Sequence, residues 1–127
     1  METVVRKICL DSDVLISLLN KDEKAYTSLQ NLNATFYITA ITSFELWCGK
    51  NKPETIFELL ETFSALDFDT HAGRLAGNLF RKLKEQGNLL EMRDMFIGAI
   101  CIKNDIELLT FNKKHFERLK QFGLRLA

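Results

Sequence analysis

Short apolar runs alternate with amphipathic stretches along the chain. The first run extends from Val4 to Leu10 and is short enough for a buried strand, and the residues after it have the spacing of a helix. The same succession then repeats toward the end of the chain. Strands that alternate with helices predict a mainly parallel sheet of four to five strands with helices on both faces, which is a three-layer α/β/α fold.

The pattern gives approximate bounds for each element. Strands are predicted at residues 4–10, 35–39, 65–68, 106–110 and 124–126. Helices are predicted at residues 14–19, 23–32, 43–48, 54–63, 70–86 and 113–120, and from residue 91 or 93 to residue 103. Ser12 or Asp13 is available as the N-cap of the first helix, and Thr70 as the N-cap of the long one.

Composition narrows the class of protein. The chain has 127 residues, of which 46% are hydrophobic and 27% charged, and this predicts one globular domain over residues 1–127. We expect a cytoplasmic protein that makes no membrane contact, since the sequence has neither an apolar run of about 18 residues nor the order of a signal peptide. Cys9, Cys48 and Cys101 have apolar neighbours and are predicted to be reduced core residues.

Charge is balanced overall but unevenly distributed. Residues 1–73 hold 6 Lys and Arg against 11 Asp and Glu, a net −5, whereas residues 74–127 hold 11 against 6, a net +5. A net charge of zero argues against a nonspecific coat for nucleic acid. The asymmetry can place an acidic centre beside a basic rim, although solvated helix faces would account for most of these charges equally well.

Three isolated acids are the main candidates for chemistry. Asp11 ends the first apolar run, where a buried strand would deliver it to the carboxyl edge of the sheet. Glu45 follows the second strand among apolar neighbours, and Asp94 opens an apolar helix, although either acid could simply stabilise a helix dipole. Three carboxylates at one edge repel each other unless a cation lies between them, and all-oxygen ligands favour Mg²⁺ or Mn²⁺ over zinc.

Polar residues after the last long strand would meet the same edge. Thr110 can hydrogen-bond a carboxylate and Asn112 can orient a water or reach a phosphate oxygen, or both can form a turn before the next helix. Arg93, Lys113 and Lys114 are placed to meet a polyanion or to form a solvated face. The two histidines have no metal-ligand spacing, and neither a Ser–His pair nor a Gly-rich phosphate loop is present.

Four segments together resemble the PIN-domain ribonucleases, and within them the VapC-type toxins of toxin–antitoxin pairs. Residues 10–16, Leu-Asp-Ser-Asp-Val-Leu-Ile, resemble the family's L-D-T-N-V-L-I, and residues 41–49 its I-T-x-x-E-L-x-x-G. Residues 94–99 resemble D-x-x-I-A-A, and residues 109–116 its closing motif, with Asn112 at the variable polar position and His115 in place of the usual Asp. The resemblance covers almost the entire chain.

The resemblance implies an endoribonuclease that needs Mg²⁺ or Mn²⁺. Asp11 and Asp94 would bind the metal, Glu45 would bind it through water or orient the attacking water, and Asn112 would take the fourth position. It also implies an RNA substrate, a homodimer, and a VapB-type antitoxin that covers the acidic cleft with a basic side chain. Whether a second metal binds stays open, as does the residue that completes the site; the candidates are Asp13, Glu91, Thr110 and Glu117.

Two other functions remain as alternatives. A haloacid-dehalogenase-type phosphatase would use Asp11 as a nucleophile, but that fold needs a paired-acid motif and the chain has no Asp-Asp pair. A noncatalytic PIN-like module for binding RNA or protein would keep the fold and lose the acids, whereas three acids are retained here. The sequence does not specify which RNA is cleaved.

Overall fold

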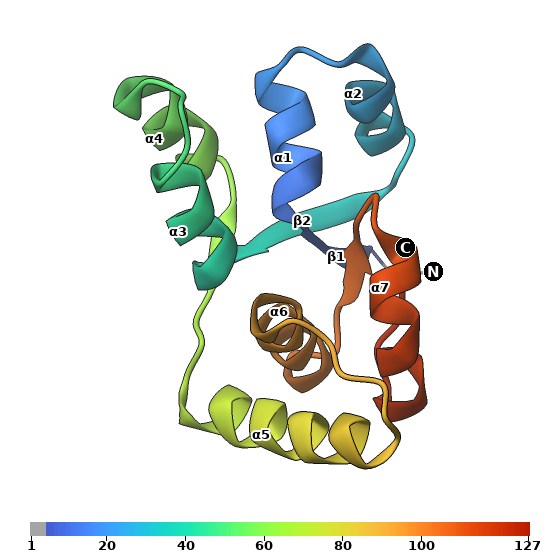
Figure 1. The fold of residues 1–127 in the computed structure, drawn as a ribbon. Helices are drawn as coiled ribbons and strands as arrows, with labels where there is room; N and C mark the ends of the chain where they lie inside the picture. The colour runs from blue at the N-terminus through green and yellow to red at the C-terminus, as the bar shows by residue number, and fades with distance from the viewer. Residues whose placement is uncertain (1–4) are drawn as a thin grey trace.

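A four-stranded parallel sheet lies between two layers of helices in the computed structural model, which describes residues 5–127 (Figure 1). The strands are β1 (Arg6–Leu10), β2 (Ala34–Thr39), β3 (Ser64–Leu66) and β4 (Glu107–Leu109), in the order β3-β2-β1-β4. The helices are α1 (Ser12–Leu19), α2 (Glu23–Gln30), α3 (Ala40–Trp47), α4 (Pro53–Glu61), α5 (Thr70–Glu85), α6 (Met92–Lys103) and α7 (Lys113–Phe116), followed by the 3₁₀ helix η1 (Glu117–Phe122). The predicted α/β/α class is confirmed, and every strand pair is parallel.

The core has two parts, one on each face of the sheet. In β1, Ile8 and Leu10 point toward α1, α3 and α4, whereas Cys9 between them points toward α5 and α6. Figure 1 shows α1 to α4 on one side of the sheet and α5 to α7 on the other. Because both faces of β1 are covered, the strand carries apolar residues without the alternation expected of a half-exposed sheet.

The register aligns the carboxyl ends of the central strands. Leu10 pairs with Leu109, and the N–H group of Asp11 donates to the Leu109 carbonyl at 2.9 Å. On the other side β1 pairs with β2, which leads directly into α3. The residues that follow β1, β2 and β4 therefore meet at one edge, as expected for a site in an open α/β sheet.

Two predicted helix caps are wrong by one or two residues. Asp11, rather than Ser12 or Asp13, is the N-cap of α1, since it has extended backbone angles and its side chain accepts from the N–H group of Ser12. Asp69, rather than Thr70, caps α5, because its carboxylate accepts from the Ala72 N–H group at 2.9 Å. An ionised carboxylate is a strong acceptor for the exposed N–H groups at a helix start.

Other differences concern the ends of the chain and one cysteine. The predicted first strand starts at Val4, which lies outside the described residues. The predicted last strand forms only one bridge, between Leu126 and Leu108, and the predicted helix 113–120 is divided into α7 and η1. Cys9 and Cys101 are buried as predicted, but Cys48 is exposed because it is the C-cap residue of a surface helix.

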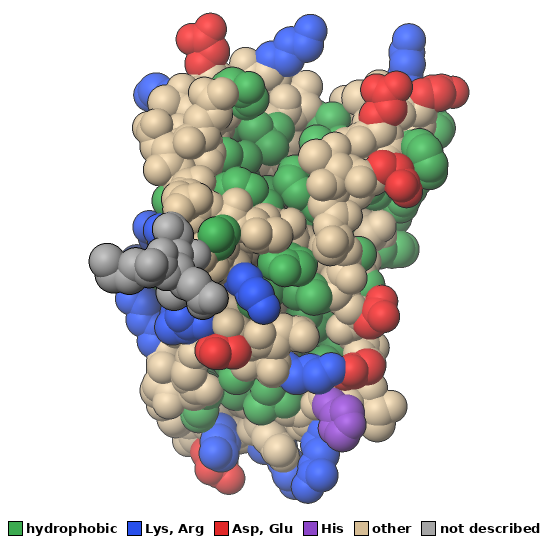
Figure 2. All heavy atoms as spheres, turned by 180° about the vertical axis from the view of Figure 1, so that it is seen from behind, with side chains coloured by type: hydrophobic (Ala, Val, Ile, Leu, Met, Phe, Trp, Pro, Cys, Tyr) green, Lys and Arg blue, Asp and Glu red, His purple; other side chains and the backbone are tan. Residues whose placement is uncertain are grey.

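The molecular surface is uneven in both shape and charge. Viewed from behind, two projections, α1–α2 and α3–α4, rise above the sheet with hydrophobic side chains in the hollow between them (Figure 2). Most Lys and Arg side chains in this view lie on the lower half, on the side of α5 and α7. In the described part of the chain, no helix combines the length and the apolar character that crossing a membrane requires.

Candidate active site

Three predicted acids lie together at the carboxyl edge of the sheet. Asp11 follows β1, Asp94 lies in the first turn of α6, and Glu45 lies in the second turn of α3. The two aspartates are only 2% and 3% exposed, whereas the Glu45 side chain is 30% exposed. Beside them is a cleft of about 250 Å³, lined by Asp11, Asp13, Glu91, Arg93, Asp94, Asn112 and His115.

The guanidinium of Arg93 lies between the three carboxylates. Its Nη2 donates to Asp11 Oδ1 at 2.6 Å, its Nε donates to Glu45 Oε2 at 2.7 Å, and its Nη1 donates to Asp94 Oδ1. Burial alone would lower the pKa of Arg93, but the hydrogen bonds to Glu45 and Asp11 raise it above its ordinary value. The cluster is thus held together by a cation that belongs to the same chain.

Hydroxyl groups fix the carboxylates around this cation. Thr110 Oγ1 donates to Asp11 Oδ2 at 2.8 Å, while Asp11 Oδ1 accepts from the Ser12 N–H group at 2.8 Å. The Ser12 hydroxyl donates to Glu45 Oε1 at 3.1 Å and accepts from Arg93. Each buried oxygen of Asp11 therefore has a partner, which offsets the cost of its burial.

Asp13 is the acid in the cleft whose hydrogen bonding is incomplete. Its Oδ2 accepts from the Phe111 N–H group at 3.1 Å, but its Oδ1 is buried and has no hydrogen-bond partner among the described residues. Burial, followed by the negative charge of Asp11, raises the pKa of Asp13 above 3.8, and the N–H groups of Phe111 and Val14 offset only part of this. Ionised Asp13 therefore destabilises the folded protein.

Asp13→Asn is expected to increase the free energy of unfolding near neutral pH in the absence of metal. The folded-state pKa of Asp13 is raised, so wild-type stability falls as pH rises from the unfolded to the folded pKa and stays lower above it. The gain from the substitution should shrink as pH is lowered through the folded-state pKa toward 3.8 and be nearly absent below 3.8. Urea unfolding of both proteins in EDTA across this range measures the difference. A gain that is constant with pH would attribute the effect to packing instead of charge.

The β4–α7 loop supplies the remaining polar groups. The Asn112 N–H group donates to Thr110 Oγ1 at 3.0 Å, and its side-chain Nδ2 lies 2.8 Å from His115 Nδ1. That same ring nitrogen lies 3.7 Å from Asp94 Oδ2. Asn112 thus lines the cleft, and it is connected to the acids only indirectly, through Thr110 from its backbone and toward His115 from its side chain.

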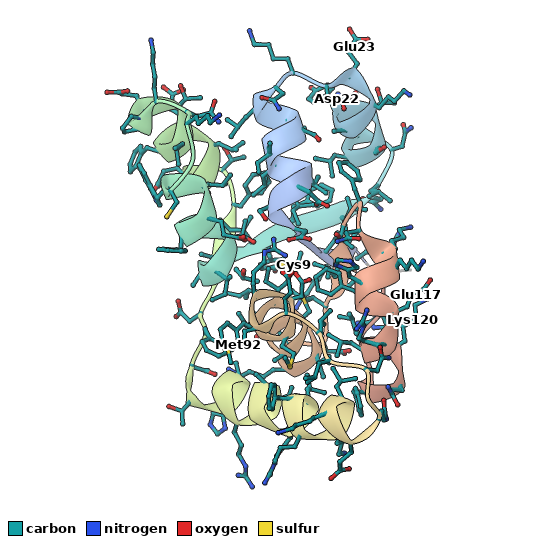
Figure 3. All side chains as sticks on the ribbon, viewed as in Figure 1. Cys9, Asp22, Glu23, Met92, Glu117 and Lys120 are labelled. Atoms are coloured by element: carbon teal, nitrogen blue, oxygen red, sulfur yellow. The ribbon has the colours of Figure 1, made fainter. Side chains whose placement is uncertain are left out.

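The four residues that were candidates for completing the site differ in how near they lie to the acid cluster. Asp13, Thr110 and Glu91 contact or line the cluster, whereas Glu117 lies on the outer side of the C-terminal helical segment (Figure 3). Lys113 and Lys114 are exposed at the start of α7.

Two sequence arguments need correction. Glu45 was expected to be enclosed by apolar neighbours, but Phe44 and Trp47 are exposed because α3 lies on the surface and only Leu46 of this group is buried. Arg93 was expected at most to meet a polyanion, yet it binds the acids themselves. Its position directly before Asp94 signals a contact with that acid, but the contacts with Asp11 and Glu45 have no signal in the neighbouring sequence.

The donor atoms of the cluster suit a hard divalent cation. They are carboxylate oxygens on three separate elements, and they already converge on a positive charge. In the present structure these oxygens are arranged around the planar guanidinium of Arg93. Across residues 5–127, no three His, Cys, Asp or Glu side chains are spaced to hold a metal ion. The ligand chemistry therefore fits Mg²⁺ or Mn²⁺, and binding requires the oxygens to regroup.

Comparison with known proteins agrees with this fold and site. A sequence model described as PIN domain matches residues 8–121. Ribonuclease VapC3 of Methanocaldococcus jannaschii is 32% identical over 72% of this chain and 94% of its own length, and ribonuclease VapC1 of the same organism is 30% identical over 99% and 90%.

Solved structures give the same fold. VapBC-1 from nontypeable Haemophilus influenzae matches with a TM-score of 0.79 at 21% identity, over 95% of this chain and 96% of the other. DNA-bound VapBC from Salmonella typhimurium matches with a TM-score of 0.77 at 24% identity, over 97% and 98%. With a family match across most of its residues and VapC ribonucleases among its relatives, this chain belongs to the PIN domain family.

Proposed function

We propose that the chain is a metal-dependent endoribonuclease and the toxin of a toxin–antitoxin pair, with residues 1–127 forming one catalytic domain. The observation that carries the proposal is the convergence of Asp11, Glu45 and Asp94 on one positive charge at the carboxyl edge of the sheet. The names of the relatives, ribonuclease VapC1 and VapC3, support RNA as the substrate.

The three acids have different roles in this proposal. Asp11 and Asp94, which are almost fully buried, would hold Mg²⁺ or Mn²⁺. When bound, the metal makes water a better nucleophile and neutralises charge on the phosphate. Glu45 is more exposed and is steadied by the Ser12 hydroxyl, so it can accept a hydrogen bond from the attacking water and orient it.

Groups around the cleft would position the RNA. The Asn112 amide and the His115 ring lie at its wall, where each can donate a hydrogen bond to a phosphate oxygen. Lys113 and Lys114 are exposed at the start of α7 and add positive charge beside the acids. Phe111 is exposed in the same loop and can stack on an unpaired base.

A VapB-type antitoxin is the proposed protein partner. Structural neighbours of this chain are toxin–antitoxin complexes, among them the two VapBC structures. Ile16, Phe44, Trp47 and Phe57 are exposed on α1, α3 and α4, which flank the hollow seen in Figure 2. Exposed apolar residues so close to an acidic cleft favour a partner that covers both, and a homodimer would cover more of this surface. Such a pair would act in the cytoplasm, where RNA is available.

The alternatives are less well supported. A haloacid-dehalogenase-type phosphatase would need a paired-acid motif, and the chain has no Asp-Asp pair. A noncatalytic module has no reason to keep two buried aspartates beside an exposed glutamate, since burying carboxylates costs stability.

Cleavage of total RNA by the purified protein tests the proposal. Discrete fragments are expected with Mg²⁺ or Mn²⁺, none with EDTA, and none from Asp94→Asn, which serves as the control for contaminating nucleases. Equal cleavage by wild type and Asp94→Asn would assign the activity to a contaminant. Absence of cleavage with either metal would favour the binding module.

A further inference from the structure

We propose that Arg93 is an internal substitute for the divalent cation: in the metal-free protein its guanidinium occupies the acid cluster, and metal binds only when Arg93 leaves. The proposal rests on the proposed function for the identity of the competing cation. In this proposal a side chain of the protein itself lowers the affinity of the acid cluster for the metal ion.

The guanidinium and a metal ion need the same oxygens. Arg93 takes Oδ1 of Asp11 and Oδ1 of Asp94, the two residues expected to hold the metal, and Oε2 of Glu45. Mg²⁺ would approach such oxygens to about 2.1 Å. A guanidinium nitrogen already lies 2.6 Å from Asp11 Oδ1, so there is no room for both cations at this oxygen. Repulsion between the two positive charges acts in the same direction.

The contact is built into the fold and does not resemble a chance surface pair. The Arg93 side chain is 29% exposed, and it bonds Asp11, which follows β1, and Glu45 of α3, which lie 82 and 48 positions away. The Ser12 hydroxyl accepts a further hydrogen bond from it. A guanidinium has five N–H donors in a planar fork, so one side chain can serve several carboxylates at once.

Charge makes the exchange possible. The three carboxylates sum to −3 and Arg93 contributes +1, so the occupied cluster keeps a net charge of −2 and still attracts a divalent ion. Departure of Arg93 alone would leave three mutually repelling carboxylates, which is unfavourable. The metal-free protein therefore keeps Arg93 in place. The apparent metal affinity is the intrinsic affinity multiplied by the small fraction of molecules in which Arg93 has left the cluster.

Manganese binding without RNA provides the test. The dissociation constant for Mn²⁺, measured by electron paramagnetic resonance of the free ion, is expected to fall about tenfold or more in Arg93→Gln, a change of about 1.4 kcal/mol or more in binding free energy. Arg74→Gln, on the exposed face of α5, removes the same charge away from the cluster and should leave the constant within about twofold of wild type. Circular dichroism establishes that each variant is folded.

A second variant covers the case in which Arg93→Gln does not fold without metal. Arg93→Lys keeps the charge but has a single ammonium that cannot serve three carboxylates, so tighter Mn²⁺ binding than wild type is expected here too. Unchanged or weaker Mn²⁺ binding in the folded variants would overturn the proposal. If wild type still shows metal-dependent cleavage, only this displacement is wrong; if it shows none, the proposed function fails separately.

Discussion

Asp11→Asn is expected to lower the rate of RNA cleavage by about a thousandfold or more at saturating Mg²⁺. Metal ions contribute several kcal/mol of charge stabilisation in phosphoryl transfer. Each loss of about 1.4 kcal/mol lowers a rate about tenfold. Replacing Asp11 removes one of the two buried carboxylates proposed to hold the ion, and one of the three negative charges of the cluster. Initial rates of fragment formation from a defined RNA measure the effect.

The same variant should keep the fold and the affinity for RNA. Asparagine is as good an N-cap as aspartate, so the bond to the Ser12 N–H group at the start of α1 can persist. Loss of a negative charge beside the cleft should leave RNA binding unchanged or improve it, as measured by filter binding in EDTA. Asp67→Asn, an exposed position outside the cleft, is the matched control.

Two results would contradict this expectation. Cleavage by Asp11→Asn at more than a tenth of the wild-type rate would show that Asp11 is not a metal ligand. Loss of RNA binding together with loss of cleavage, in a folded variant, would make Asp11 part of the RNA-contact surface instead.

Phe116→Ala is expected to lower the free energy of unfolding by about 3–5 kcal/mol, the range for truncating a buried phenylalanine. Phe116 is 0% exposed and packs in the core between the sheet and α5–α6, where Leu119 and Ile97 are also buried. The cavity left by the ring cannot close without moving α7. Since small domains are stable by only about 5–15 kcal/mol, this is a large part of the total.

Urea unfolding of the metal-free protein measures this loss. Phe57→Ala removes the same ring from a position that is 56% exposed, and it should change the free energy of unfolding by no more than about 0.5 kcal/mol. A loss below about 1 kcal/mol for Phe116→Ala would mean that α7 repacks over the gap. Cleavage should also fall in that case, because Asn112 and His115 belong to the same segment.

The central strand β1 could be predicted because its buried end has the pattern of a parallel strand. A parallel strand covered on both faces is a short apolar run, and Ile8, Cys9 and Leu10 form such a run before an acid. The positions of Asp11 and Asp94 at the sheet edge were predictable as well. Each carboxylate borders a buried apolar element, where an unpaired charge would be costly. Asp94 in particular keeps its predicted place in the first turn of α6.

Other features depend on contacts between distant segments, and local pattern does not contain them. The bonds of Arg93 join α6 to Asp11 at the start of α1 and to Glu45 of α3, and nothing near residue 93 indicates that these two acids will be within reach. The exposure of Phe44 and Trp47 was mispredicted because an apolar residue next to an acid can belong to a surface helix as easily as to a core. Whether such a residue is buried or exposed depends on tertiary packing.

Assembly of the acid cluster also depends on how much of the chain has been synthesised. The bond from Thr110 to Asp11 joins residues 99 positions apart, and the bond from Arg93 to Asp11 joins residues 82 apart. A nascent chain that has emerged from the ribosome only as far as β3 carries Asp11 and Glu45 but neither Asp94 nor the neighbouring strand β4. The growing polypeptide therefore cannot complete the acid cluster until both α6 and β4 have been synthesised.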